Sequence, residues 1–142
     1  MADRRLGLIM HGVTGRMGYN QHLVRSILAI RDQGGVVLSN GDRLVVDPII
    51  VGRDADKIER LAKKHDIKRW SSDLDAALAN PEDTVFFDAG TTLMRASLLE
   101  RALAAGKHVY CEKPTSDSLE VALNLAKTAR ASGLKHGVVQ DK

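Results

Sequence analysis

The feature that most constrains this chain is the regular alternation of short apolar runs with segments of helical periodicity. Apolar runs at 6–10, 44–51, 84–89, 108–111 and 136–140, with a shorter one near Arg69, predict strands. Helical patterns lie between them at 15–30, 54–65, 73–79, 93–105 and 118–131. Strands separated by helix-length segments need crossover connections, which are typical of a parallel sheet with helices on both faces. The expected fold class is therefore α/β, a doubly wound, mostly parallel, Rossmann-like sheet in one domain over residues 1–142.

Three local features refine this expectation. The first helix is expected to turn one side inward, formed by Met17, Leu23, Val24, Ile27 and Leu28. Residues 31–42 are punctuated by Gly and Asn and predict a loop. Pro48 lacks a backbone N–H for a sheet ladder, so it indicates an edge or an irregularity in the second strand.

Composition excludes several classes of protein. No apolar run approaches the roughly 18 residues of a membrane span, and MADRR lacks the apolar stretch of a secretory signal. The single cysteine, Cys111, has no partner for an internal disulfide and is expected to be a small, partly buried apolar residue. The five histidines show no metal-ligand spacing, so no metal is predicted. We expect a cytoplasmic protein with no membrane partner.

The net charge of +3 raises the question of an acidic partner. In the helix predicted at 54–65, however, basic and acidic residues alternate, a mixture that is typical of a solvated face. Aromatic residues make up only 4% of the chain, which leaves few platforms for stacking bases. We therefore expect no nucleic-acid partner.

A glycine-rich segment, GLIMHGVTGRMG at 7–18, joins the first strand to the first helix. Gly12, Gly15 and Gly18 are evenly spaced, with Thr14 where the dinucleotide fingerprint G-x-G-x-x-G has its second glycine. At this position backbone N–H groups can approach a pyrophosphate, and the positive end of the helix dipole favours its charge. Thr14 adds a hydroxyl and Arg16 a guanidinium, and Met17 follows in the same turn. The segment predicts a variant phosphate loop; a tight turn without a ligand is the alternative.

The end of the second strand bears on the choice of cofactor. An NAD-preferring site usually has an acidic residue there for the adenosine ribose, whereas this strand ends in Gly52 and Arg53. Gly52 leaves space, and Arg53 offers a forked cation to a 2′-phosphate. NADP is the expected cofactor, with NAD as the second choice. The alternative is a surface arginine beside Asp54 acting as a helix cap.

The segment AAGKHVYCEKP, residues 104–114, resembles the glucose–fructose oxidoreductase / inositol dehydrogenase / rhizopine-catabolism (Gfo/Idh/MocA) family. Together with the glycine loop and the order of elements, the resemblance covers essentially the whole chain. It implies a pyridine-nucleotide oxidoreductase that acts on sugar or cyclitol hydroxyls. It further implies that the glycine loop binds the cofactor and that Lys113, flanked by Glu112 and Pro114, lies near the nicotinamide and the substrate oxygen. A solvent-exposed lysine before a helix is the alternative for Lys113.

Two departures from the family pattern are visible. Where the family commonly reads Thr-Pro-Asn-x-x-His, this chain has GTTLMR at 90–95, so Gly90 and Thr91 are candidates to line the cofactor crevice. Arg95 replaces the histidine, and no role carries over to it. The family's second α/β domain, which supplies most of the substrate site, would begin near residue 142. We therefore expect residues 1–142 to be a cofactor-binding half that is inactive alone, with homo-oligomers an open question for a full-length protein.

Two other functions remain open from the sequence. GVTGRMG also resembles the phosphate loop of dihydrodipicolinate reductases, although the EKP segment and the long region between the first helix and the second strand argue against that enzyme. A nucleotide-binding or redox-sensing module without chemistry of its own is the non-enzymatic alternative. The small-molecule substrate expected from the family is a sugar or polyol.

Overall fold

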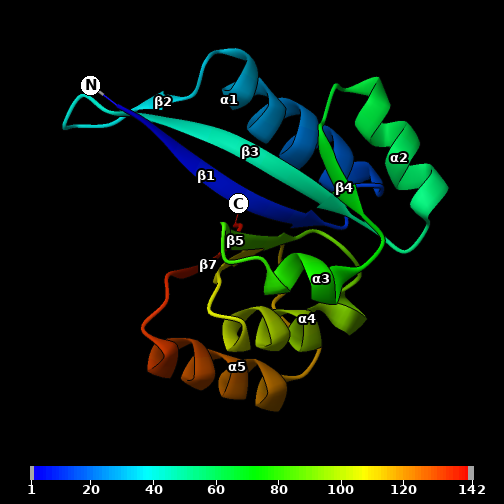
Figure 1. Cartoon of the computed structure of the whole chain (residues 1–142). Helices are drawn as coiled ribbons and strands as arrows, with labels where there is room; N and C mark the ends of the chain where they lie inside the picture. Colours follow the sequence, from blue (N-terminus) through cyan, green and yellow to red (C-terminus); the bar gives the residue numbers. More distant parts are fainter. Residues whose placement is uncertain (1, 141–142) are drawn as a thin grey trace.

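A computed structural model describes residues 2–140 and shows seven strands in one twisted sheet (Figure 1). The strands are β1 (Asp3–His11), β2 (Val36–Val37), β3 (Arg43–Val51), β4 (Arg69–Ser71), β5 (Asp83–Asp88), β6 (His108–Cys111) and β7 (His136–Val138). Their order is β2-β3-β1-β5-β6-β7, and β4 pairs with β3. Every pairing is parallel except that of β2 with β3. The predicted α/β fold with a mostly parallel sheet is confirmed.

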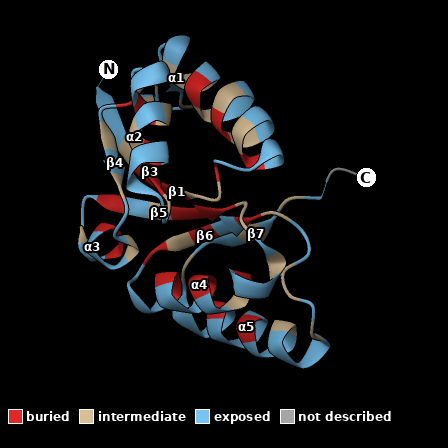
Figure 2. Ribbon diagram, turned by 90° about the vertical axis from the view of Figure 1, so that its right-hand side faces the viewer, coloured by how far each residue is buried: buried red, intermediate tan, exposed pale blue. Residues whose placement is uncertain are grey.

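Helices cover both faces of the sheet and give the molecule three layers (Figure 2). They are η1 (Gly18–Leu28), α1 (Ala29–Asp32), α2 (Ala55–Lys64), α3 (Leu74–Ala79), α4 (Thr92–Ala104) and α5 (Leu119–Ser132). Residues of η1 and α2 share one buried cluster with β1, β3 and β5, whereas α3, α4 and α5 share the other. The crossover helices thus lie on opposite faces in the two halves of the chain, as a doubly wound sheet requires.

Because side chains alternate along the central strands, each strand contributes residues to the buried clusters on both faces of the sheet. Ile9 on β1 packs with α4 and α5, while Leu8 and Met10 on either side of it pack with η1 and α2. Phe86 and Phe87 on β5 divide in the same way. Because successive side chains of a strand point to opposite faces, an unbroken apolar run is what a sheet covered on both faces needs.

Helix ends follow local signals in the sequence. Asp54 accepts a hydrogen bond from the Lys57 N–H (3.1 Å), Asp73 one from the Ala76 N–H (3.0 Å) and Ser118 one from the Val121 N–H (3.4 Å). These caps satisfy amide groups that have no partner inside their own helices. Gly133 ends α5 with a φ of 71°, a left-handed conformation that favours glycine. The predicted boundaries of these helices are confirmed to within a residue or so.

The first helix differs from its prediction. The helix runs over residues 16–32, but residues 18–28 form a π-helix, with α-helical residues at 16–17 and 29–32. Met17, expected on the inward side, is 52% exposed. It is one of the two helical residues, 16–17, that precede η1, and the wider turn of a π-helix breaks the 3.6-residue spacing from which the inward set was predicted. Leu23 and Leu28 are buried, and Val24 and Ile27 are half-buried.

The region between the first helix and the second strand also differs. Within the predicted loop at 31–42, Val36–Val37 form the antiparallel strand β2 on Arg43–Leu44. Two residues are too few for a periodic signal, and both side chains are exposed. On the same edge of β3, β4 pairs with 49–51, so Pro48 lies in a stretch between the two partner strands. Pro48, which indicated an edge or an irregularity, therefore lies where β3 has no partner strand on that side.

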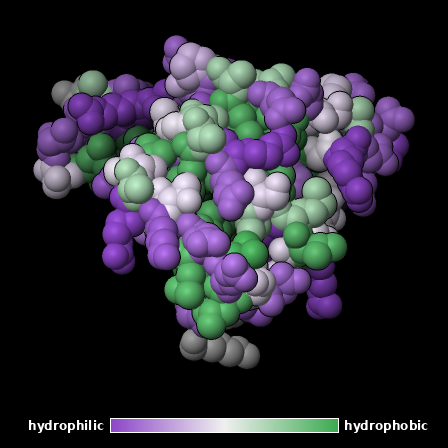
Figure 3. Space-filling view, turned by 90° about the horizontal axis from the view of Figure 1, so that it is seen from below, coloured by the Kyte–Doolittle hydropathy of each residue, from purple (hydrophilic) through white to green (hydrophobic). Residues whose placement is uncertain are grey.

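On the face seen from below, hydrophobic side chains extend from the middle of the view to its lower end and are interspersed with hydrophilic ones (Figure 3). On the helices of this layer, Leu93, Leu119 and Leu123 are largely exposed. Among residues 2–140, none of the helices has the length and hydropathy that crossing a membrane demands.

Candidate functional site

The carboxyl ends of four neighbouring strands lie in register. Val51 of β3 is paired with His11 of β1, His11 with Asp88 of β5, and Asp88 with Cys111 of β6. The segments that follow these strands, which begin at 52, 12, 89 and 112, therefore start side by side along one edge of the sheet. This edge brings together the four groups of site residues that the sequence predicts.

The three glycines of the loop have different neighbours. At Gly12 the φ is 77°, and a Cβ would overlap the backbone of Ala89 and Gly90. At Gly18 a Cβ would overlap the carbonyl oxygen of Gly12. At Gly15 the nearest atom to a Cβ would be Gly12 O at 3.8 Å, and its φ is not positive. Packing of the protein itself therefore requires glycine at 12 and 18, whereas Gly15 leaves open space at the surface.

The remaining loop residues face solvent at the start of the first helix. Tyr19 N donates to Gly15 O (2.8 Å), so the preceding amides belong to the first helical turn and have no partner within the helix. Thr14, Arg16 and Met17 are exposed. Arg16 and Met17 border a hollow of about 360 Å³ that runs along η1 to Arg25. These are the conditions under which a helix start attracts an anion.

The end of β3 has a packed glycine and an exposed cation. A Cβ at Gly52 would lie 2.8 Å from the Ile58 side chain, so the missing side chain makes room for α2 against the sheet. Arg53 is exposed and has neither a hydrogen bond nor an ion pair with any residue in the 2–140 range. The Asp54 carboxylate accepts from the Lys57 N–H and caps α2.

Asp88 is the buried centre of the second half of the edge. Its Oδ1 accepts from Gly90 N (3.0 Å) and lies 2.7 Å from His11 Nδ1, and its Oδ2 accepts from Arg95 Nε (3.0 Å). Burial acts to raise the pKa of Asp88, but the hydrogen bonds from His11, the Gly90 N–H and Arg95 outweigh it and hold the pKa below its usual range. Asp88 is therefore an anion that ties β1, β5 and α4 together.

Arg95 connects this centre to the EKP turn. Its side chain is 2% exposed and donates to Gly90 O (2.7 Å) and Pro114 O (2.6 Å) as well as to Asp88. The residue that departs from the family pattern is thus a buried bridge across three segments of the edge. The sequence alone assigns no role to His11, Asp88 or Arg95. A charged residue at the end of the apolar run TVFFDA was the available signal for Asp88.

The EKP turn presents one engaged and one free side chain. Glu112 N donates to Asp88 O (2.9 Å), and Glu112 Oε1 lies 2.6 Å from His22 Nε2 on η1. Its other carboxylate oxygen accepts from Lys113 N (3.1 Å). The Lys113–Pro114 peptide is cis. Lys113 is exposed, and its ammonium has no polar partner within residues 2–140, as is also true of the Thr91 hydroxyl at the start of α4.

Neither a reactive thiol nor a cluster of metal ligands occurs in the part of the chain that the structure describes. Cys111 is buried, and burial raises the pKa of its thiol to about 11, so it stays protonated near neutral pH. Cys111 was expected to be partly buried; it is almost fully buried, at 1% exposure, as part of the apolar core. No cluster of three His, Cys, Asp or Glu residues with metal-binding geometry occurs between residues 2 and 140.

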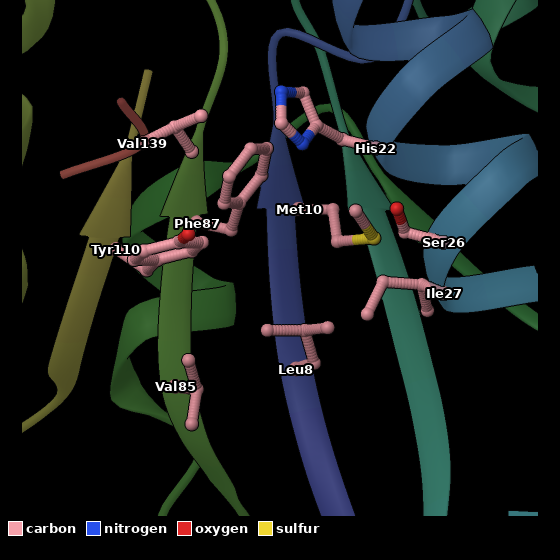
Figure 4. A pocket seen from close by; sticks show the side chains of 9 residues that line it. All are labelled: Leu8, Met10, His22, Ser26, Ile27, Val85, Phe87, Tyr110 and Val139. Carbon is pink, nitrogen blue, oxygen red and sulfur yellow. The ribbon is translucent and has the colours of Figure 1, made fainter. Parts of the chain in front are cut away.

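A separate apolar hollow of about 260 Å³ lies under η1 on the face of the sheet (Figure 4). Its walls are formed by β1, β5 and β6 and by Ser26 and Ile27 of η1, with His22 nearest the glycine loop. His22 lies over Phe87 with 4.7 Å between ring centroids. This hollow is on the sheet face and does not include the predicted site residues.

Comparisons with known proteins agree with this arrangement. The sequence model of the Gfo/Idh/MocA family, described as an oxidoreductase family with an NAD-binding Rossmann fold, matches residues 10–140. A D-xylose dehydrogenase from Paenarthrobacter nicotinovorans is 50% identical over 133 residues, which cover 94% of this chain and 34% of the relative. A 1,5-anhydro-D-fructose reductase from Ensifer adhaerens is 30% identical over 110 residues, which cover 77% of this chain and 30% of the relative.

A solved structure of an NAD-binding oxidoreductase from Klebsiella pneumoniae superposes with a TM-score of 0.78 at 26% identity, covering 96% of this chain and 34% of that one. The chain thus spans about a third of the length of the relatives it matches. The sequence resembles two enzyme families, the Gfo/Idh/MocA oxidoreductases and the dihydrodipicolinate reductases. The comparisons favour the Gfo/Idh/MocA family. The chain belongs to the Gfo/Idh/MocA oxidoreductase family and forms its NAD-binding Rossmann domain.

Proposed function

We propose that this domain binds a nicotinamide dinucleotide along the carboxyl edge of the sheet, with the pyrophosphate on the glycine loop. The observation that carries the proposal is the contrast among the loop glycines. Gly12 is held against Gly90 by packing, whereas Gly15 has open space that the protein alone does not require. A glycine that leaves the backbone bare at a helix start is what close approach of a pyrophosphate needs.

Different residues along this edge would contact the pyrophosphate, the adenosine and the nicotinamide of the cofactor. Gly12, Thr14, Gly15, Arg16 and Met17 would surround the pyrophosphate. Gly52 and Arg53, at the end of β3, would lie at the adenosine. The nicotinamide end would lie toward the other half of the edge, bordered by Gly90, Thr91, Glu112 and Lys113.

Lys113 is the proposed catalytic residue. The nicotinamide, when bound, accepts or donates a hydride. The Lys113 ammonium has no polar partner within residues 2–140, so it is available to hold a substrate oxygen as charge develops on it. The Arg95 bond to Pro114 O holds the next residue of the turn in place.

A sugar or polyol is the proposed substrate, supported by the 50% identical D-xylose dehydrogenase. Because the chain spans about a third of that relative, we propose that most of the substrate site lies outside residues 1–142. The domain alone should bind cofactor and show no steady oxidation of D-xylose.

NADP is the proposed preferred cofactor. The carboxylate nearest the end of β3, Asp54, is engaged in capping α2, and the neighbouring Arg53 is exposed with no protein partner in the described chain. A guanidinium at this position pairs with a 2′-phosphate, whereas a carboxylate there would repel it.

Isothermal titration of residues 1–142 with NADPH and with NADH tests the proposal. Both should bind, NADPH more tightly, and Arg53→Ala should weaken NADPH about tenfold with little effect on NADH. Arg130→Ala, on exposed α5, is the matched control and should change neither affinity. If neither cofactor binds the parent chain, the cofactor proposal fails. If both bind equally, only the preference fails.

A further inference from the structure

A hydrogen bond joins the first helix to the EKP turn. His22 Nε2 on η1 lies 2.6 Å from Glu112 Oε1, although 90 residues separate the two in the sequence. Each side chain is only 14% exposed. A carboxylate oxygen accepts and does not donate, so the imidazole Nε2 is the donor of this pair. The contact therefore connects the helix that starts at the glycine loop with the turn that carries Lys113.

The His22 ring is held in place by its neighbours. It lies over Phe87 of β5 with 4.7 Å between ring centroids, and Phe87 in turn lies 5.9 Å from the ring of Tyr110 on β6 (Figure 4). The start of η1 is packed on the glycine loop, because a Cβ at Gly18 would overlap Gly12 O. The donor is thus presented to the EKP turn from a packed support, which is what keeps a functional side chain in one geometry.

The EKP turn is tied from both faces of the sheet. Arg95 of α4 donates to Pro114 O (2.6 Å) from the face that α4 covers. From the other face, His22 of η1 holds one oxygen of the Glu112 carboxylate. The second oxygen accepts from Lys113 N (3.1 Å). Both carboxylate oxygens are therefore engaged without the Lys113 ammonium, which has no polar partner within residues 2–140.

We infer that His22 is a positioning residue of the nicotinamide half of the site. It fixes Glu112 and, through Glu112, the orientation of the turn that presents Lys113. The inference rests on the proposed function, which places the nicotinamide beside these two residues. A charge-assisted hydrogen bond is among the stronger polar contacts in a protein, so the turn relaxes when the donor is removed. A bound dinucleotide then loses contacts at its nicotinamide end and keeps those at the glycine loop.

The test separates the two ends of the cofactor. NADH reports on both ends, whereas ADP carries the adenosine and the two phosphates and lacks the nicotinamide riboside. The affinity of residues 1–142 for each is measured by titration calorimetry, and the fluorescence of bound NADH reports on the surroundings of the dihydronicotinamide. His22→Leu removes the donor, and His22→Gln supplies an amide N–H in place of the imidazole N–H. His65→Leu is the matched control, because His65 is also half-buried and also contacts η1 through its Nε2, at the Tyr19 hydroxyl (2.7 Å).

His22→Leu should weaken NADH about five- to tenfold and ADP less than about twofold, and it should change the fluorescence of bound NADH. His22→Gln should bring NADH back to within about twofold of the parent. His65→Leu should change the NADH and ADP affinities by the same factor, because its contact lies away from the EKP turn. In a Glu112→Ala background, His22→Leu should have no further effect on NADH, because the residue through which it acts is gone.

A lower urea midpoint in His22→Leu with an unchanged ratio of NADH to ADP affinity would make the pair a structural contact only and overturns the inference. A full effect of His22→Leu in the Glu112→Ala background overturns it as well. If His22→Leu does not fold, His22→Asn, whose amide is too short to reach Glu112, takes its place with the same expectations. Absence of both NADH and ADP binding to the parent overturns the proposed function and the inference with it.

Discussion

The two halves of the carboxyl edge differ in how their polar groups are used. In the first half, which comprises the glycine loop and the end of β3, Thr14, Arg16 and Arg53 are exposed, and none has an ion pair within the described chain. In the second half, comprising the end of β5, the start of α4 and the EKP turn, Asp88 and Arg95 are almost fully buried and bonded to each other. The first half presents unpaired donors to solvent, whereas the second half is held together by contacts around Asp88 and Arg95 and leaves the Lys113 ammonium and the Thr91 hydroxyl unpaired within residues 2–140.

The difference shows how one edge can both receive a ligand and keep its shape. An exposed donor without a protein partner costs little free energy, because water satisfies it. When an anion binds, the same donor forms a strong, charge-assisted hydrogen bond. A buried carboxylate and a buried guanidinium destabilise the fold unless their polar atoms are hydrogen-bonded. These hydrogen bonds in turn hold the surrounding backbone in place. We expect the first half to control affinity and the second half to control stability.

The largest expected effect comes from breaking the contacts around Asp88 and Arg95. Arg95→Ala leaves the Asp88 carboxylate with one donor fewer and the Gly90 and Pro114 carbonyls without theirs, and should cost about 3–5 kcal/mol of unfolding free energy. Urea unfolding followed by circular dichroism measures it. Arg101→Ala is the control, because Arg101 pairs with Asp75 at the surface and should contribute no more than about 1 kcal/mol. Equal losses in the two variants would show that the second half is not held together as described.

The next effect contrasts two glycines of one loop. Gly12→Ala should destabilise the chain by about 2–4 kcal/mol, because its Cβ meets the Gly90 backbone and its φ is positive. Gly15→Ala has space for its Cβ and should leave stability within about 0.5 kcal/mol of the parent while weakening NADPH binding. Urea midpoints and calorimetric titrations separate the two outcomes. A Gly15→Ala variant that binds like the parent would remove the loop from the proposed site.

Features that depend on local sequence were predictable. The caps at Asp54, Asp73 and Ser118 and the strand at 108–111 follow from the residues themselves, and they lie where the patterns indicate. The convergence of the candidate site at one edge follows from the parallel order alone, since the carboxyl ends of parallel strands share an edge.

Long-range contacts were not predictable in the same way. His11 and Asp88 are separated by 77 residues, and Arg95 and Pro114 by 19, so no short pattern reports their pairing. A family resemblance gives the residue that is common at each position. At position 95 the family commonly has histidine and this chain has arginine, so the resemblance gave no contacts for Arg95. The π-helix at 18–28 escaped detection because the helical spacing assumed for it was that of an α-helix.

The smallest expected effect is a pH dependence of stability that arises from His65, at the end of α2. Burial lowers the pKa of His65 from its usual 6.5, and the charges of Lys64 and Arg31 lower it further. Its neutral form is therefore favoured by folding. The contribution of this group to stability is fully present above pH 6.5 and is lost as the pH falls through the lower folded pKa.

Lys64→Gln removes a positive charge beside the imidazole and should raise the pKa of His65 toward 6.5, which narrows the pH range over which this stability is lost. The titration of the His65 ring is followed by NMR in the parent, in Lys64→Gln and in Lys63→Gln. Lys63→Gln is the control for charge, since Lys63 is paired with Glu59 and does not contribute to the shift. A His65 pKa at or above 6.5 in the parent, or one indifferent to Lys64, would contradict the effects of burial and of the Lys64 charge described for this group.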